Sequence, residues 1–139
     1  MLSYRQFMKM GISFNRRWSW YFILYLIFCV VIGANAYRNG LPAELSIIPY
    51  YDTIAHFFLI GWLGFLAHKA INEHSLAIKN FSIALGPMVI AFLSIMDESC
   101  QTLSPHRTFS LLDLAMNLSG ILFFYIVNKF LNYRKSLVE

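Results

Sequence analysis

Cysteines and strongly basic runs are scarce in this sequence. Its 139 residues include two cysteines, too few for a disulfide framework. Cys29 lies in the middle of an apolar block and Cys100 near the end of another, so we do not expect them to pair. The formal net charge is +4, but no basic run is interleaved with aromatic residues. We therefore expect no nucleic-acid partner.

The sequence also lacks the common short motifs of catalysis. It has no H-E-x-x-H metal motif, no glycine-rich loop that would cradle a phosphate, and no evident activated nucleophile. Repeats, low-complexity runs and domain linkers are absent as well. These absences favour a single domain and leave open whether the protein is an enzyme.

Long apolar blocks dominate what is present. The chain is 58% hydrophobic, whereas a soluble domain is usually about 45–50% apolar. Each block can cross a bilayer core of about 30 Å, which takes roughly 20 residues. A soluble protein of this size could not bury four such blocks, so the predicted fold class is an all-α membrane protein with four transmembrane helices. The blocks are residues 18–37, 52–70, 81–103 and 110–131.

The segments around these blocks set the predicted boundaries. Residues 132–139 form a basic cytoplasmic tail, and residues 18–131 form the transmembrane domain. Residues 1–17 form a cytoplasmic lead-in, for which one alternative is an interfacial helix. That helix would use Phe7, Met8, Ile12 and Phe14.

Three further local features of the chain lead to predictions. Arg16-Arg17 followed by an apolar stretch and Ala34-Asn35-Ala36 resembles a cleaved signal peptide, but the long lead-in and long apolar stretch disfavour cleavage. Residues 71–79 are expected to form a polar turn. Gly86-Pro87 is expected to kink the third membrane helix, where such a pair is tolerated.

The positions of the basic residues predict the orientation. Nine of the 11 lysines and arginines lie in the lead-in, the middle turn and the tail, which leaves Arg38 and Arg107 for the other two loops. Because cytoplasmic loops carry an excess of Lys and Arg, we expect both termini in the cytoplasm.

With this topology, the polar residues within the blocks gather at the outer face. Asp52/His56, Asp97/Gln101 and Asp113/Asn117 are each four residues apart, so each pair shares one helix face. Asp113 and Asn117 form a stripe along one helix face. Gly120 extends this stripe and would let a neighbouring helix approach closely. We expect a shared polar site that takes residues from three helices. Its predicted members are Asp52, His56, Asp97, Glu98, Gln101, Arg107, Asp113 and Asn117.

Several of these residues have a simpler structural explanation. Asp52 could be a helix N-cap, and Ser110-x-x-Asp113 fits a variant capping box. Gln101 could bond only to the backbone, and His106 is better explained as a solvated loop residue. We expect Arg107 to bind a carboxylate, with Asp113 or Glu98 as the best candidates, because its flat guanidinium suits a two-point contact.

The ordered set of motifs resembles the VanZ-like family of small bacterial membrane proteins. The matching pieces are D-T-I-A-H-F-F from Asp52 to Phe58, and D-E-S-C-Q-T-L-S-P-H-R-T-F-S-L-L-D-L-A-M-N-L-S-G from Asp97 to Gly120. The resemblance covers roughly residues 18–131. It implies a four-helix protein of the bacterial plasma membrane, and it aligns Glu98 better than Asp97 with the family's acidic position.

Three functions follow as alternatives. The first is a VanZ-like envelope protein whose outer site engages a cell-surface or lipid-linked group; the family's name-giving member is associated with teicoplanin resistance. The second is an enzyme acting on a lipid-linked phosphate or sugar, with His56 as general base, Asp52 orienting it, and Glu98 and Asp113 as further candidates. The third is an accessory subunit of a larger membrane complex.

The expected partners follow from the same reasoning. They are membrane lipids together with one of those ligands or complexes. No cofactor is expected. A zinc site using His56 and Glu98 is conceivable, but two such residues are thin support for one, so no metal is predicted.

The topology can be tested by cysteine labelling of intact cells. In a background lacking Cys29 and Cys100, single cysteines at Gly40 and Ser104 should react with an impermeant thiol reagent. Cysteines at Glu73 and Ser136 should not react, because the charge bias places them inside. Labelling at Glu73 would contradict the four-crossing arrangement.

Overall fold

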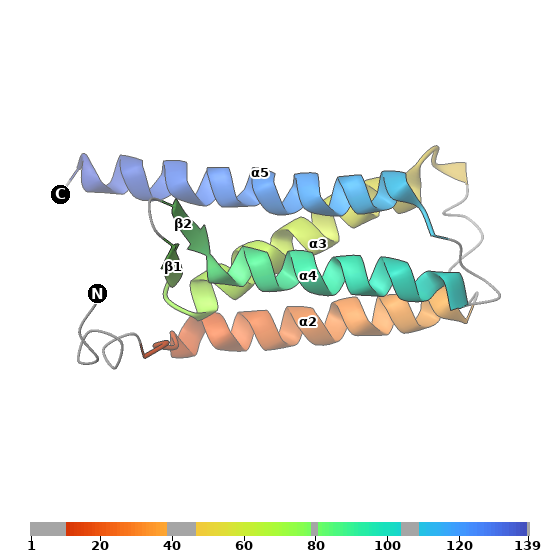
Figure 1. The fold of residues 1–139 in the computed structure, drawn as a ribbon, viewed down its shortest axis with the longest axis horizontal. Helices are drawn as coiled ribbons and strands as arrows, with labels where there is room; N and C mark the ends of the chain where they lie inside the picture. The colour runs from red at the N-terminus through yellow and green to blue at the C-terminus, as the bar shows by residue number, and fades with distance from the viewer. Residues whose placement is uncertain (1–10, 39–46, 79–80, 104–108, 139) are drawn as a thin grey trace.

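The computed structural model describes residues 11–38, 47–78, 81–103 and 109–138. These residues form four long helices and one β-hairpin (Figure 1). The helices are α2 (Arg16–Tyr37), α3 (Tyr51–Ala70), α4 (Leu85–Cys100) and α5 (Leu111–Ser136), and a 3₁₀ turn, η2 (Gln101–Leu103), follows α4. The hairpin consists of β1 (Ser75–Ile78) and β2 (Phe81–Ala84).

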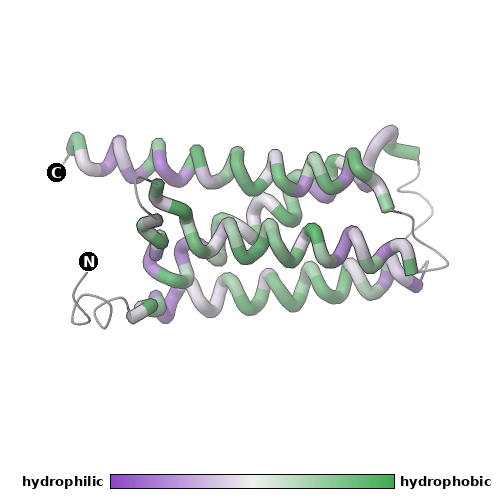
Figure 2. Tube along the Cα trace, in the orientation of Figure 1, coloured by the Kyte–Doolittle hydropathy of each residue, from purple (hydrophilic) through white to green (hydrophobic). Residues whose placement is uncertain are grey.

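The four helices lie side by side and define two ends of a bundle (Figure 1). The hairpin end holds the start of α2, the end of α3, the hairpin and the end of α5. The far end holds the end of α2, the starts of α3 and α5, and the end of α4. Figure 2 shows hydrophilic residues gathered toward both ends, with apolar stretches between them.

The predicted helices agree well with the structure at three of four starts. Helices α2, α3 and α5 begin within two residues of the expected positions. Helix α5 continues beyond the predicted block, through most of the predicted tail, to Ser136. Arg134 and Lys135 occupy its last turn, where positive charge interacts favourably with the helix dipole.

The third block departs from its prediction. Residues 81–84 pair with residues 75–78 in an antiparallel hairpin, with Ser75 opposite Ala84, so the helix begins only at Leu85. The predicted polar turn over residues 71–79 is therefore partly strand. Pro87 stands in the first turn of α4, where its missing N–H costs no hydrogen bond. The Gly86-Pro87 pair consequently belongs to the first turn of α4 and does not kink the interior of the helix.

Helices α3 and α5 cross with very close backbone contact. A Cβ added at Gly120 would lie 2.1 Å from the carbonyl oxygen of Phe57, and one added at Gly61 would lie 2.7 Å from the carbonyl carbon of Gly120. Neither position has room for a larger residue. Gly120 therefore does what its spacing predicted and lets the two helices meet.

Helix α3 lies at the centre of the bundle and packs against α2, α4 and α5. One cluster of buried apolar side chains lies in the core and consists of Leu63, Ala67, Ile90 and Ile121. None of the residues of α2 is buried. This helix therefore borders the bundle with most of its surface exposed.

Burial in this bundle is inverted relative to a soluble protein. Its largest fully buried side chains are Gln101, Glu98 and Asn128. Exposed large apolar side chains occur along all four helices and include Leu24, Phe58, Phe92 and Leu122. Among the helices of the described residues, α2 and α5 are long and apolar enough to cross a membrane.

A polar network ties α3 to α5 at the hairpin end. Glu73 accepts hydrogen bonds from Lys69 and from Asn132, the latter at 2.6 Å from Nδ2 to Oε2. Burial raises the pKa of the Glu73 carboxyl, but the hydrogen bond and charge of Lys69 outweigh it and leave that pKa below its ordinary value. The glutamate therefore keeps its negative charge and the network at neutral pH.

Substituting Gly120 tests the close helix crossing. Gly120→Ala should lower the free energy of unfolding by roughly 1–3 kcal/mol, because the added Cβ forces the α3 backbone away. Gly33→Ala is the matched control, since nothing lies within 4 Å of its added Cβ, and better helix propensity should make it neutral or slightly stabilising. Thermal unfolding in detergent measures both, and equal melting temperatures would contradict the close contact.

Candidate functional site

The far end of the α3–α5 crossing brings polar side chains together. Thr53 donates from Oγ1 to Oδ1 of Asp113 at 2.8 Å. His56 Nδ1 lies 3.1 Å from Oδ1 of Asn117. Asp113 is 8% exposed and Asn117 is 3% exposed, so their polar atoms depend on partners within the protein. The predicted Asp113/Asn117 stripe does face another helix, and that helix is α3.

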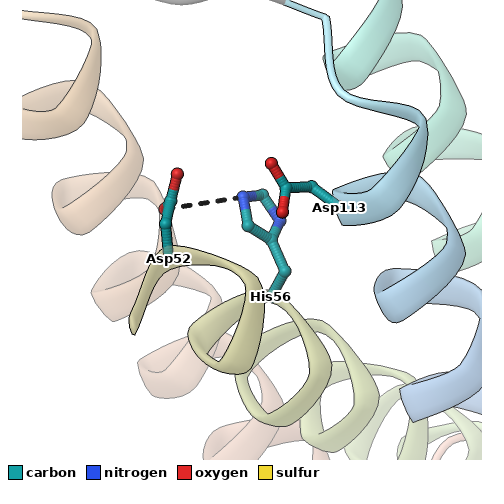
Figure 3. A group of neighbouring side chains, drawn as sticks. All are labelled: Asp52, His56 and Asp113. Atoms are coloured by element: carbon teal, nitrogen blue, oxygen red, sulfur yellow. Dashed lines mark ion pairs between the residues drawn. The ribbon is translucent and has the colours of Figure 1, made fainter. Parts of the chain in front are cut away.

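The contact with Asn117 fixes the orientation of the His56 ring. An amide oxygen can only accept a hydrogen bond, so Nδ1 is the nitrogen that carries hydrogen in this contact. Nε2 then faces Asp52, whose Oδ1 lies 3.7 Å away (Figure 3). The predicted Asp52/His56 pairing is present. Asn117 therefore also orients His56, a role that the enzyme hypothesis gave to Asp52 alone.

Glu98 links α4 to the start of α5. It is 0% exposed, and its two oxygens accept from the Ser110 N–H at 2.7 Å and from Gln101 Nε2 at 2.9 Å. Ser110 is the N-cap of α5, and its Oγ accepts from the Asp113 N–H at 3.2 Å. In a capping box the third helical residue would bind the Ser110 N–H; here Glu98 of another helix does so.

The predicted Asp97/Gln101 pair does not form. Helix α4 ends at Cys100, and Gln101 turns inward to Glu98, three residues earlier, while Asp97 is exposed. Asp97 instead accepts at Oδ1 from the Tyr37 hydroxyl of α2 at 3.1 Å. Tyr37 is not among the predicted site residues, and no motif in the sequence marks its contact with Asp97.

Three other expectations concern helix starts and loops. The N-cap of α3 is Tyr50, with a left-handed φ of 56° and no side-chain cap bond, so the N-cap explanation of Asp52 is wrong. Asp52 stands in the first turn, where a carboxylate interacts favourably with the helix dipole. Arg107 and His106 lie outside the described residues, so the predicted Arg107–carboxylate contact stays a prediction.

A long groove runs between α2 and α4, with α3 as its floor. Its volume is about 790 Å³, and its walls are mostly apolar, with Phe22, Leu26, Leu63 and Ile90 among them. Polar residues line it near the far end: Tyr37, His56, Asp97 and Asn117. Ser94 also lines it, is 6% exposed, and its hydroxyl has no hydrogen-bond partner among the described residues. The groove thus combines a long apolar wall with a polar end.

One group of side chains has the spacing of metal ligands. Asp52, His56 and Asp113 each offer an atom within 4.8 Å of the others (Figure 3). Glu98 is not in this group, and its oxygens are bonded to Ser110 and Gln101. The combination of His56 with Glu98 considered for zinc is therefore not what the structure brings together.

Comparison with known proteins identifies no relative. No protein-family model matches the chain, and no curated protein or solved structure is significantly similar to it.

Removing the Glu98 carboxylate tests its structural role. Glu98→Ala should lower the free energy of unfolding by roughly 2–3 kcal/mol, because the Ser110 N–H and the Gln101 amide lose a charged acceptor. Asp97→Ala is the neighbouring control, and its exposed side chain predicts a change within about 0.5 kcal/mol. Equal thermal unfolding of the two variants in detergent would contradict this role.

Proposed function

We propose that this chain is a VanZ-like, four-crossing protein of the bacterial plasma membrane that binds a lipid-linked group at its outer face. The inverted burial supports a membrane setting. In water, apolar side chains exposed along all four helices would form very large patches. In lipid they are in a favourable solvent, and the polar side chains are expected to face inward and satisfy one another.

The positions of the basic residues support the orientation. Arg16, Arg17, Lys69, Arg134 and Lys135 lie in the segments that meet at the hairpin end. Arg38 follows α2 at the far end. The hairpin end then faces the cytoplasm, and the polar cluster faces outward.

The short α4 and the hairpin also suit this arrangement. At 1.5 Å per residue, the 16 residues of α4 span about 24 Å, less than a hydrocarbon core of about 30 Å. A two-stranded hairpin has unpaired edges that the hydrocarbon region does not tolerate, so it belongs in the headgroup layer. Glu98 and Asp97 then lie close to the outer interface.

The groove is the observation that carries the ligand proposal. Its apolar length suits a hydrocarbon chain, and its polar end offers a hydroxyl, an imidazole, a carboxylate and an amide from Tyr37, His56, Asp97 and Asn117. The Ser94 hydroxyl, buried and without a partner among the described residues, adds a group for a polar atom of the ligand. A ligand with an apolar tail and a polar head fits this combination, as a lipid-linked phosphate or sugar does.

The residues that carry the family resemblance support the same function, because they lie together in the structure. The recurring residues His56, Glu98, Asp113, Asn117 and Gly120 all take part in contacts at or near the far end. The family's name-giving member is associated with teicoplanin resistance, and such a cluster would suit recognition of an envelope precursor. No reaction is assigned to it.

Filling the groove tests the proposed function. Gly33→Trp should lower binding of a polyprenyl phosphate about tenfold, which corresponds to roughly 1.4 kcal/mol, because Gly33 lines the groove and has open space beside it. Val31→Trp is the matched control, since this exposed residue of the same helix is not among those lining the groove. Native mass spectrometry of the detergent-purified protein measures bound lipid, with phosphatidylglycerol as the comparison lipid.

Two results of this experiment would contradict the proposal. One is equal occupancy of polyprenyl phosphate in wild type, Gly33→Trp and Val31→Trp. The other is the same occupancy with phosphatidylglycerol as with polyprenyl phosphate. That result would show that the groove binds membrane lipids without selectivity.

A further inference from the structure

We propose that Asp52, His56 and Asp113 bind a divalent transition-metal ion, with zinc as the best match for the ligand types. This site goes beyond the proposed lipid function and can be probed with the metal alone. It also revises the expectation from sequence that no metal is bound.

Geometry provides the first support. Asp52 and His56 lie one helical turn apart on α3, Asp113 comes from α5, and the three ligand atoms lie within 4.8 Å of one another (Figure 3). Around a zinc ion with bonds of about 2.0–2.1 Å, tetrahedral ligand atoms lie roughly 3.3 Å apart. A small side-chain rotation would bring the ligand atoms from their present separations to this distance. The Asp52 side chain is 41% exposed and has room to rotate.

The surrounding hydrogen bonds provide the second support. Metal-bound histidines almost always donate their other ring N–H to a fixed acceptor, which sets the tautomer and ring orientation. Asn117, 3% exposed, does this for His56 by accepting from Nδ1, so Nε2 is the nitrogen directed to a metal. Thr53 donates to one oxygen of Asp113 and thereby holds this carboxylate in place. Asn117 and Thr53 contribute no ligand to the group but orient two of its three members.

The groove provides the third support. His56 and Asn117 both line it, so the cluster borders a space that an outside ligand can occupy. Three protein ligands and one open position are the arrangement of zinc sites that act on a bound molecule. The imidazole argues against calcium and magnesium, which take oxygen ligands.

Zinc retention by the purified protein tests the inference. The tag-free protein, with Cys29 and Cys100 replaced by serine, would be stripped with a chelator, incubated with zinc chloride, desalted, and analysed by elemental mass spectrometry. We expect about one zinc per chain, and a loss of at least about tenfold in His56→Ala and Asp113→Asn. His74→Ala is the control, because His74 follows α3 at the hairpin end, and it should retain the metal.

A second measurement covers the case in which a variant folds poorly. Zinc should raise the melting temperature of the wild type and of His74→Ala, but not that of His56→Ala. Asn117→Ala should bind zinc about 10–100-fold more weakly at the same stoichiometry, as the loss of an outer-shell partner does. Cobalt in place of zinc should give a visible spectrum free of thiolate bands.

The inference is overturned if the wild type retains no zinc, or if His56→Ala and Asp113→Asn retain as much as the wild type. Lipid binding measured with chelator present separates the two proposals. If Gly33→Trp still differs from Val31→Trp under those conditions, the groove binds lipid without the metal.

Discussion

The contacts between polar side chains at the far end depend on the close crossing of α3 and α5. Gly61 and Gly120 let the two backbones touch, as the 2.1 Å from a Cβ at Gly120 to the Phe57 carbonyl shows. Side chains about one to two turns away then meet directly, Thr53 with Asp113 and His56 with Asn117. These are short or planar polar side chains that could not bridge a wider gap. Any larger residue at Gly120 would separate the hydrogen-bonded pairs along with the helices.

This crossing also explains how the bundle can carry polar groups inside. A buried polar atom without a partner costs about 1–3 kcal/mol, so buried polar groups need partners within the protein. At the far end the chain meets this requirement with contacts between helices: Glu98 with the Ser110 backbone, and Thr53 with Asp113. The same contacts fix how α3, α4 and α5 sit relative to one another. The hydrogen bonds that satisfy the buried polar groups are therefore the same contacts that hold these three helices together. Helix α2 differs, because it has no buried residue and is held mainly by apolar contact with α3.

Sequence could predict most of the helices because long apolar runs and end signals such as Ser110 mark them. It missed the hairpin, since four-residue strands such as Phe81–Ala84 have the same hydropathy as the helix that follows. It missed the end of α5, because hydropathy reports the apolar part of a helix and not its polar extension to Ser136. For the site, spacing identified Asp52/His56 and the stripe of Asp113, Asn117 and Gly120. It failed for Asp97/Gln101, because α4 passes into a 3₁₀ turn at Gln101. In a 3₁₀ turn residues three apart line up, and Gln101 accordingly bonds to Glu98.

The groove and the group of Asp52, His56 and Asp113 meet at His56, and Asn117, which orients His56, also lines the groove. Charge couples the chemistry of the groove to that of the group. The described residues that line the groove include Asp97 but no lysine or arginine, and Asp52 and Asp113 lie beside His56. A phosphate brought to this end would face negative charge from three carboxylates, and repulsion between like charges is strong where water is scarce. A divalent ion held by Asp52, His56 and Asp113 would reverse the sign of the local field and leave a coordination position for a phosphate oxygen. A neutral sugar headgroup needs no such ion, because hydroxyls can bond to Tyr37, Asp97 and Asn117 directly. If lipid binding requires the metal, the preferred headgroup is therefore a charged phosphate. If it does not, the preferred headgroup is a neutral sugar.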